Sequence, residues 1–162
     1  MRETDMNKSI FLDTLRVERA QWEALLGEVG EARMLQPGAA GEWSVKDIIA
    51  HVTWGERETV ELLQAHALAG SDLWNLPQDD RNAVVFEENR DRPLHEVLAE
   101  AQQVYAQLLV VLGTLSEEDL TDPRRFRNMP ANWIPWKIIA GCSYEHYQQH
   151  TPSIRAWLDQ TA

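Results

Sequence analysis

The chain has 162 residues, and its 26 acidic residues outnumber its 15 lysines and arginines, which gives a formal net charge of −11 at pH 7. This length suits one domain with a full hydrophobic core, so we expect a single domain over residues 1–162, with residues 1–5 as a disordered tail. The negative charge excludes non-specific binding to nucleic acid and to anionic membrane surfaces, because both need a cationic protein surface.

Cysteine content and apolar runs indicate the compartment. The single Cys142 excludes an internal disulfide framework, as is usual for proteins of the reducing cytosol. No apolar segment typical of a signal peptide follows the first residues, and no run of about 18 apolar residues is present to span a membrane. We therefore expect a cytoplasmic protein without a membrane partner.

The first predicted helix covers residues 6–29, where apolar residues recur at three- and four-residue steps. Glu18 falls on the same stripe, between Leu15 and Trp22. Two interpretations are open for this carboxylate. It is either a solvated residue at the edge of the stripe or a group that faces a central site.

The second predicted helix, residues 44–69, has the clearest beginning in the chain. Ser44 is a favourable N-cap, and Asp47 stands three residues later, as in a capping box. His51 lies in the second turn, and Gly55 follows it by one turn. Glycine destabilises a helix interior by about 1 kcal/mol relative to alanine. Gly55 therefore indicates a need for space, for a neighbouring helix or a ligand, while His51 is either a ligand or an ordinary core residue.

Residues 70–92 form a long connection with one short helix predicted near residues 81–89. Connections of this length inside a compact domain are uncommon and are often functional lids. Trp74 and Phe86 could cover a pocket if the connection is a lid. The alternative is a passive crossover between distant helices.

The third predicted helix covers residues 93–115 and carries a wide apolar stripe, so its expected role is in the core. Residues 121–132 are expected to be irregular. They include Arg124, Arg125 and Arg127, the only basic cluster of an acidic chain. This cluster is either a solvated charge run or an anion-binding patch at the mouth of a pocket.

The fourth predicted helix begins near residues 132–135 and carries His146 and His150 four residues apart. On a helix, this spacing places both imidazoles on one face, with Cβ atoms about 5–6 Å apart. We expect Pro152 to kink the helix just after His150. The same face is expected to point into the protein, because it also carries Ile139, Cys142 and Trp157.

A histidine pair with this spacing can reach one metal ion. Buried imidazoles also need polar partners, so two inward histidines are hard to explain as core filler. A third ligand would come from elsewhere in the chain, and His51 is the best candidate. Three imidazoles with one open position form the catalytic type of zinc site, although nickel, iron and copper also bind imidazole.

At these residues the chain resembles the DinB-like superfamily, which includes the YfiT-like proteins. The resemblance rests on the segment Trp43-Ser44-Val45-Lys46-Asp47-Ile48-Ile49-Ala50-His51 after a Pro-Gly loop, and on Glu145-His146-Tyr147-Gln148-Gln149-His150. It covers nearly the whole chain, from about residue 6 to residue 158. The ClbS/DfsB branch looks similar, and many superfamily members have Arg-Gly-Gln where this chain has Thr151-Pro152-Ser153.

The resemblance implies an all-α four-helix bundle of up-up-down-down topology, with a long crossover between the second and third helices, and often a homodimer. It also implies a divalent metal, commonly nickel or zinc, on His51, His146 and His150 rather than on His66 or His95. Similar proteins include transferases and isomerases that use a low-molecular-weight thiol, and a self-resistance protein that opens a reactive cyclopropane.

Three functions are therefore open. The chain is a metal-dependent transferase or hydrolase, with or without a thiol cofactor, that acts on a small reactive molecule. Alternatively, it is a non-catalytic module that sequesters a small molecule or a metal. The third option is a scaffold whose histidines are satisfied core groups.

Overall fold

The computed structural model describes residue 2 and residues 5–161. The expected tail at residues 1–5 falls partly on residues 1, 3 and 4, which lie outside the described residues. Within the described part of the chain the secondary structure is helical, and two isolated bridges are the only β-type pairings. No helix among these residues is long and apolar enough to cross a membrane.

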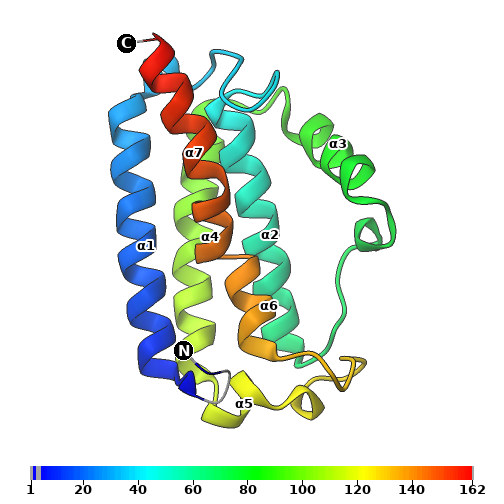
Figure 1. The fold of residues 1–162 in the computed structure, drawn as a ribbon. Helices are drawn as coiled ribbons and strands as arrows, with labels where there is room; N and C mark the ends of the chain where they lie inside the picture. The colour runs from blue at the N-terminus through cyan, green and yellow to red at the C-terminus, as the bar shows by residue number, and fades with distance from the viewer. Residues whose placement is uncertain (1, 3–4, 162) are drawn as a thin grey trace.

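The helices form the expected bundle (Figure 1). Its four columns are α1 (Lys8–Val29), α2 (Val45–Ala65), α4 (Leu94–Thr114) and the consecutive pair α6 (Pro135–Gly141) and α7 (Tyr144–Thr161). The long crossover contains η3 (Asp72–Asn75) and α3 (Gln78–Asn89), which lies along the outside of α2. The remaining short elements are η2 (Glu31–Arg33), α5 (Glu117–Thr121) and η4 (Pro123–Arg125).

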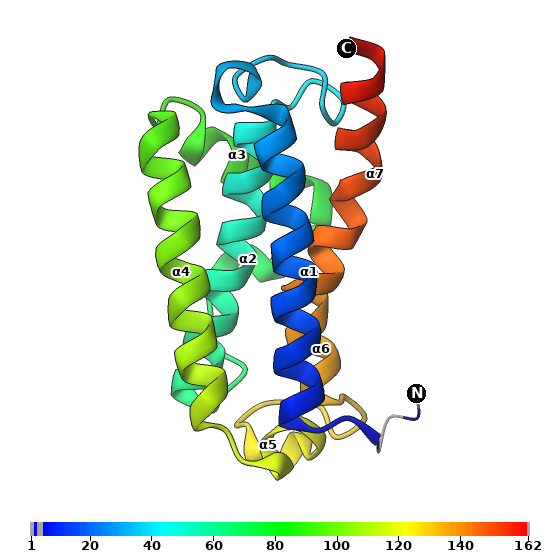
Figure 2. The ribbon, with the colours of Figure 1, turned by 90° about the vertical axis from the view of Figure 1, so that its left-hand side faces the viewer.

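Contacts between helix ends define the helix directions. Lys8, at the beginning of α1, donates to the carbonyl of Leu115 directly after α4 (3.0 Å), so these two helices are antiparallel. Lys46, in the first turn of α2, donates to the carbonyl of Arg92, two residues before the start of α4 (2.7 Å), so α2 and α4 are parallel. α7 runs beside α1 in the same direction (Figure 2).

The chain order of directions is therefore up, down, down, up. In the expected up-up-down-down order, the first helix would be parallel to the second and the third to the fourth. In the structure, α2 is parallel to α4, and α1 is parallel to α7. The reason is the connection of residues 30–44, which stays at one end of the bundle (Figure 1). Two successive "up" helices would need a connection that returns along the whole bundle, and in this chain only the α2–α4 crossover does so.

The helix that carries the histidines is preceded by a break in the fourth column, between α6 and α7. α6 ends at Gly141 and α7 begins at Tyr144. The carbonyl of Ser143 accepts from the backbone N–H of His146 (3.1 Å), so a new helix starts there. α7 continues through Pro152 to its end. Proline deletes a single backbone hydrogen bond, and the bonds of the neighbouring turns carry the helix past it.

Candidate metal centre

Two helices bring the three predicted histidines together. His51 lies in the second turn of α2, which begins at the predicted capping box: the backbone N–H of Asp47 donates to the Ser44 hydroxyl, and the N–H of Ser44 donates to the Asp47 carboxylate. His146 and His150 lie one turn apart in α7. Local helix signals together with the packing of α2 against α7 thus form the cluster.

The imidazole rings are close enough to share one ion. Nε2 of His51 lies 3.0 Å from Nε2 of His146. The ring centroid of His150 lies 5.2 Å from that of His51 and 4.8 Å from that of His146. With zinc–nitrogen bonds of about 2.0–2.1 Å, two ligands of one ion lie roughly 3 Å apart. The cluster therefore has the dimensions of a three-histidine metal site, with one nitrogen of each ring within 4.8 Å of the others.

Each imidazole has one buried nitrogen without a hydrogen-bond partner among the described residues. These atoms are Nδ1 of His51, Nδ1 of His146 and Nε2 of His150. Buried polar atoms nearly always have a partner in folded proteins, and leaving one unpaired destabilises the fold by about 1–3 kcal/mol. The Nε2 atoms of His51 and His146 contact each other, so the unpaired atom of each ring is the other nitrogen, Nδ1. Nε2 of His150 has no partner among the described residues, and a shared ion would give it one.

Burial keeps the three histidines neutral. Burial lowers the pKa of His146 to about 3, and repulsion from His51 and His150 adds to the effect. The pKa of His51 falls to about 4 because of burial, His150 and the positive charge of Arg81. Burial also lowers the pKa of His150. All three side chains are neutral at pH 7, which is the form of imidazole that ligates a metal.

Gly55 lies at the contact between α2 and α7, beside the cluster. A Cβ atom at this position would lie 3.7 Å from Nδ1 of His146 and 3.8 Å from the carbonyl oxygen of Cys142. The helix next to this glycine is α7, and a single Cβ atom at position 55 would meet it at ordinary contact distances. On another side of the cluster, the ring of Trp43 meets His51 edge-on, with centroids 5.3 Å apart.

The long connection between α2 and α4 covers one face of α2. Phe86 of α3 stacks on Trp43, with ring centroids 5.8 Å apart. Trp74 packs against Trp54 of α2 (4.9 Å) and donates its indole N–H to the Glu58 carboxylate (2.9 Å). Trp74 therefore packs on α2, and Phe86 packs on the residue before its N-cap. These contacts are compatible with a lid and with a passive crossover.

Several other sequence candidates lie away from the cluster. His66 is the exposed, left-handed C-cap of α2. It lies about 22 Å farther along this helix than His51. Arg124 pairs with Asp122, and Arg125 pairs with Asp119, both at 3.0 Å. The predicted basic cluster is thus partly neutralised by its own neighbours. Two further candidates are exposed: His95 and Arg127.

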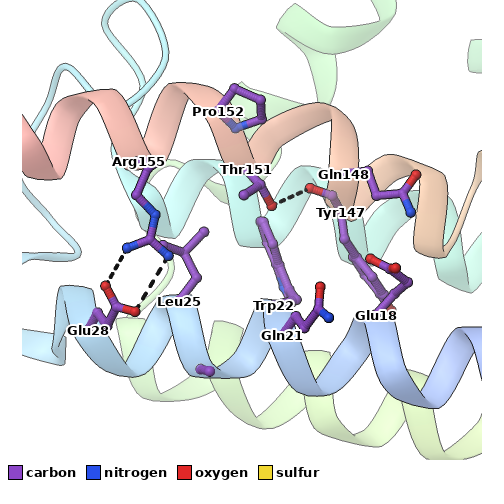
Figure 3. Close-up of a pocket in the computed structure, with 11 residues that line it drawn as sticks. Glu18, Gln21, Trp22, Leu25, Glu28, Tyr147, Gln148, Thr151, Pro152 and Arg155 are labelled. Carbon is purple, nitrogen blue, oxygen red and sulfur yellow. Dashed lines mark hydrogen bonds and ion pairs between the residues drawn. The ribbon is translucent and has the colours of Figure 1, made fainter.

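Glu18 lines a groove between α1 and α7 rather than the histidine cluster (Figure 3). The groove has a volume of about 460 Å³ and includes Tyr147 and Gln148. An ion pair between Arg155 and Glu28 crosses it (Figure 3). Gln148 lies midway between the two histidines in sequence, so it points to another face of α7. The groove and the histidine cluster are therefore separate features of the same helix.

The sequence pattern did not reveal a buried polar network beside the cluster. Arg19 of α1 is 5% exposed, Glu56 of α2 is 0% exposed and Tyr147 of α7 is 1% exposed. Arg19 donates to the Tyr147 hydroxyl (2.9 Å) and to the Glu56 carboxylate (3.3 Å), and Tyr147 donates to Glu56. Arg19 also donates to the carbonyl of Ala101 in α4 (3.3 Å). Four helices are thus tied together by one network.

A sequence signal for this network did exist. Arg19 stands four residues after Leu15 and three before Trp22, so it falls on the apolar stripe of α1. A charge on such a stripe indicates a buried partner. Glu18 is next to Arg19 in sequence, but only Arg19 is buried.

The network fixes the two helices at the level of the cluster. Glu56 directly follows Gly55, and Tyr147 directly follows His146. Burial raises the pKa of Glu56 to about 7, although Arg19 and the hydrogen bond from Tyr147 oppose that shift. The contact of Gly55 with His146 and the polar bonds of Glu56 with Tyr147 therefore lie next to each other on the α2–α7 interface.

Comparisons with known proteins agree with this architecture. A model of the DinB superfamily matches residues 14–154. The crystal structure of an uncharacterised protein from Escherichia coli UTI89 has a similar fold, with a TM-score of 0.75 and 13% identity over 96% of this chain and 94% of that chain. At this identity the likeness concerns the fold alone. No curated protein matches the chain at a significant level.

Proposed function

The chain belongs to the DinB superfamily, and from this premise we propose that it holds a divalent transition-metal ion on His51, His146 and His150. The observation that carries the proposal is the convergence of three neutral imidazoles, with one possible ligand nitrogen of each within 4.8 Å of the others. Imidazole ligands suit zinc and nickel, whereas calcium and magnesium prefer oxygen. We therefore expect zinc or nickel.

We further propose that the site transfers a group to, or hydrolyses, a small reactive molecule. A bound divalent ion supplies Lewis acidity and favours the deprotonated form of a nucleophile. Three protein ligands leave a position open for that nucleophile or for the substrate. The partly buried histidines would hold the reacting groups beside the ring of Trp43, which limits the access of water from that side.

The nucleophile would come from outside the chain. Cys142 is the only thiol, and burial raises its pKa although a hydrogen bond with Thr59 opposes the shift. A thiol with a raised pKa is protonated at pH 7 and is a weak nucleophile. Water or a low-molecular-weight thiol therefore suits the proposed reaction better than Cys142.

Metal content tests the site directly. Wild-type protein exposed to Zn²⁺ or Ni²⁺ and then desalted is expected to retain about one ion per chain by elemental mass spectrometry. His51→Ala and His146→Ala are expected to lose that ion, because each removes one of three ligands. His95→Ala is the matched control, since His95 is exposed and lies outside the cluster. Full stoichiometric metal in both ligand variants would show that the site is elsewhere.

Turnover separates an enzyme from a sequestering module. The metal-loaded protein is to be incubated with small electrophiles, each with water alone and with a panel of thiols, and products are followed by mass spectrometry. Multiple turnovers that disappear in His146→Ala would support catalysis. Binding of the electrophile at one equivalent without product would instead favour sequestration, which the aromatic stack of Trp43 and Phe86 would also suit.

A further inference from the structure

Arg81 of α3 lies level with the histidine cluster. Five residues after it, Phe86 stacks on Trp43, and Trp43 meets His51 edge-on at 5.3 Å. On the other side, the Arg81 guanidinium lies over the ring of Trp74, 4.7 Å from its centroid. Two aromatic contacts thus bracket Arg81 and hold its helix against the α2 face that carries His51.

The electrostatics agree with this placement. After burial and His150, the positive charge of Arg81 contributes to the lowered pKa of His51. The same charge acts on Cys142, at the junction of α6 and α7. Arg81 belongs to neither helix of the cluster, and the ring contacts of Trp74 with Trp54 and of Phe86 with Trp43 place its helix beside α2.

The guanidinium of Arg81 is partly buried, yet it forms no hydrogen bond or ion pair with any residue that the structure describes. Arg16 and Arg127 likewise have no side-chain partner among the described residues, but both are exposed. Two arginines nearby behave differently: Arg57 and Arg92 both pair with Glu100. The planar fork of a guanidinium matches a carboxylate, which it binds through two parallel hydrogen bonds. Arg81 thus offers an unused anion-binding group beside neutral imidazoles.

The surroundings restrict the anion. The net charge of −11 repels a doubly charged phosphate more strongly than a singly charged carboxylate. The rings of Trp74 and Trp54, which pack at 4.9 Å, provide an apolar wall next to the guanidinium. Ligand sites typically combine such walls with a few polar groups that fix orientation.

We propose that Arg81 binds the carboxylate of a small, apolar monocarboxylic acid whose other end reaches the histidine cluster. Arg81 would thereby determine the substrate class of the site. This inference rests on the proposed function, because it concerns the ligand of the same centre. It makes Arg81 a specificity-determining residue rather than a metal ligand.

The test compares an acid with its neutral amide. Protein loaded with Co²⁺, whose absorption spectrum reports its ligand environment, is titrated with phenylacetate and with phenylacetamide by calorimetry. Wild type is expected to bind the acid about tenfold tighter or more, as for a charge-assisted hydrogen bond. Arg81→Met is expected to abolish that preference, while Arg81→Lys keeps part of it. Arg90→Met is the matched control: it removes an equal charge from the exposed residue that follows α3.

The outcomes distinguish this inference from the proposed metal site. Equal affinity of wild type for acid and amide, or an unchanged acid affinity in Arg81→Met, would overturn the role of Arg81 even if Co²⁺ binds stoichiometrically. Failure of wild type to bind Co²⁺ would overturn the metal site instead. In that case the same titration on metal-free protein still tests Arg81, since the acid preference is expected to persist there.

Discussion

Substitutions of Gly55 separate two effects of a larger side chain at the α2–α7 contact. One is the effect on helix stability, and the other is the effect on the position of His146. A Cβ atom there would lie at ordinary van der Waals distances from its neighbours, 3.7 Å from Nδ1 and 3.9 Å from Cε1 of His146. Gly55→Ala therefore fits without movement and removes the helix penalty of glycine. We expect its free energy of unfolding to rise by about 0.5–1 kcal/mol, with Zn²⁺ affinity unchanged within about threefold.

Gly55→Val is expected to have the opposite effect. Carbon–carbon bonds of about 1.5 Å would bring a γ-methyl group to within roughly 2.5 Å of the imidazole or of the Cys142 carbonyl, which is well inside contact distance. The protein must relieve this overlap by moving His146. Overpacking of this kind destabilises by about 1–3 kcal/mol. A shift of a ligand by more than about 0.5 Å also degrades a metal site, so we expect Zn²⁺ affinity to fall by about tenfold or more.

Urea denaturation measures the first effect, and competition with a chromophoric zinc chelator measures the second. Gly27 is the matched control position, because a Cβ atom there meets nothing within 4 Å and the residue is exposed on α1. Gly27→Val should leave Zn²⁺ affinity unchanged. Wild-type affinity in Gly55→Val would refute the reasoning, since it would mean that His146 does not need the space above Gly55.

Three further predictions concern stability. Arg19→Met and Glu56→Gln should each lower the free energy of unfolding by roughly 3–5 kcal/mol, and the double variant should lose clearly less than the sum in urea; additive losses would show that the two groups are not coupled. The pKa values of His51 (about 4) and His146 (about 3) lie below the ordinary value of 6.5. At a pH between the folded and the ordinary pKa, the unfolded chain therefore binds more protons than the folded chain. Metal-free protein should lose stability as pH falls from 6.5 toward 4, by up to about 3 kcal/mol for His51. A flat urea midpoint over that range would contradict the pKa shifts. Ser44→Ala should lower the unfolding free energy by about 1 kcal/mol, and an unchanged urea midpoint would show that the cap contributes nothing.

The sequence alone determined the features that depend on neighbours a few residues away. The capping box of Ser44 and Asp47 is complete within four residues, and the structure contains both of its hydrogen bonds. The spacing of His146 and His150 places two imidazoles on one helix face for the same local reason. The apolar stripes of the long helices likewise predicted a four-helix bundle, which the structure confirms.

The tertiary structure decided what depends on contacts between distant segments. Arg19, Glu56 and Tyr147 are far apart in sequence, so no local pattern shows that their charges and hydroxyl meet in the core. The helix directions also required the structure, because they depend on where each connection crosses the bundle.

The surroundings of the candidate centre show the same division. The four-residue spacing on α7 indicated His146 and His150 as metal ligands, and the resemblance to the DinB-like superfamily indicated His51 as the third ligand. The position of Arg81 follows from ring contacts of α3 with Trp43 and Trp74, and His146 packs beside Gly55. Helix formation is local because its hydrogen bonds join residues four apart. The groups that surround the cluster come from different helices, so their positions depend on how the helices pack.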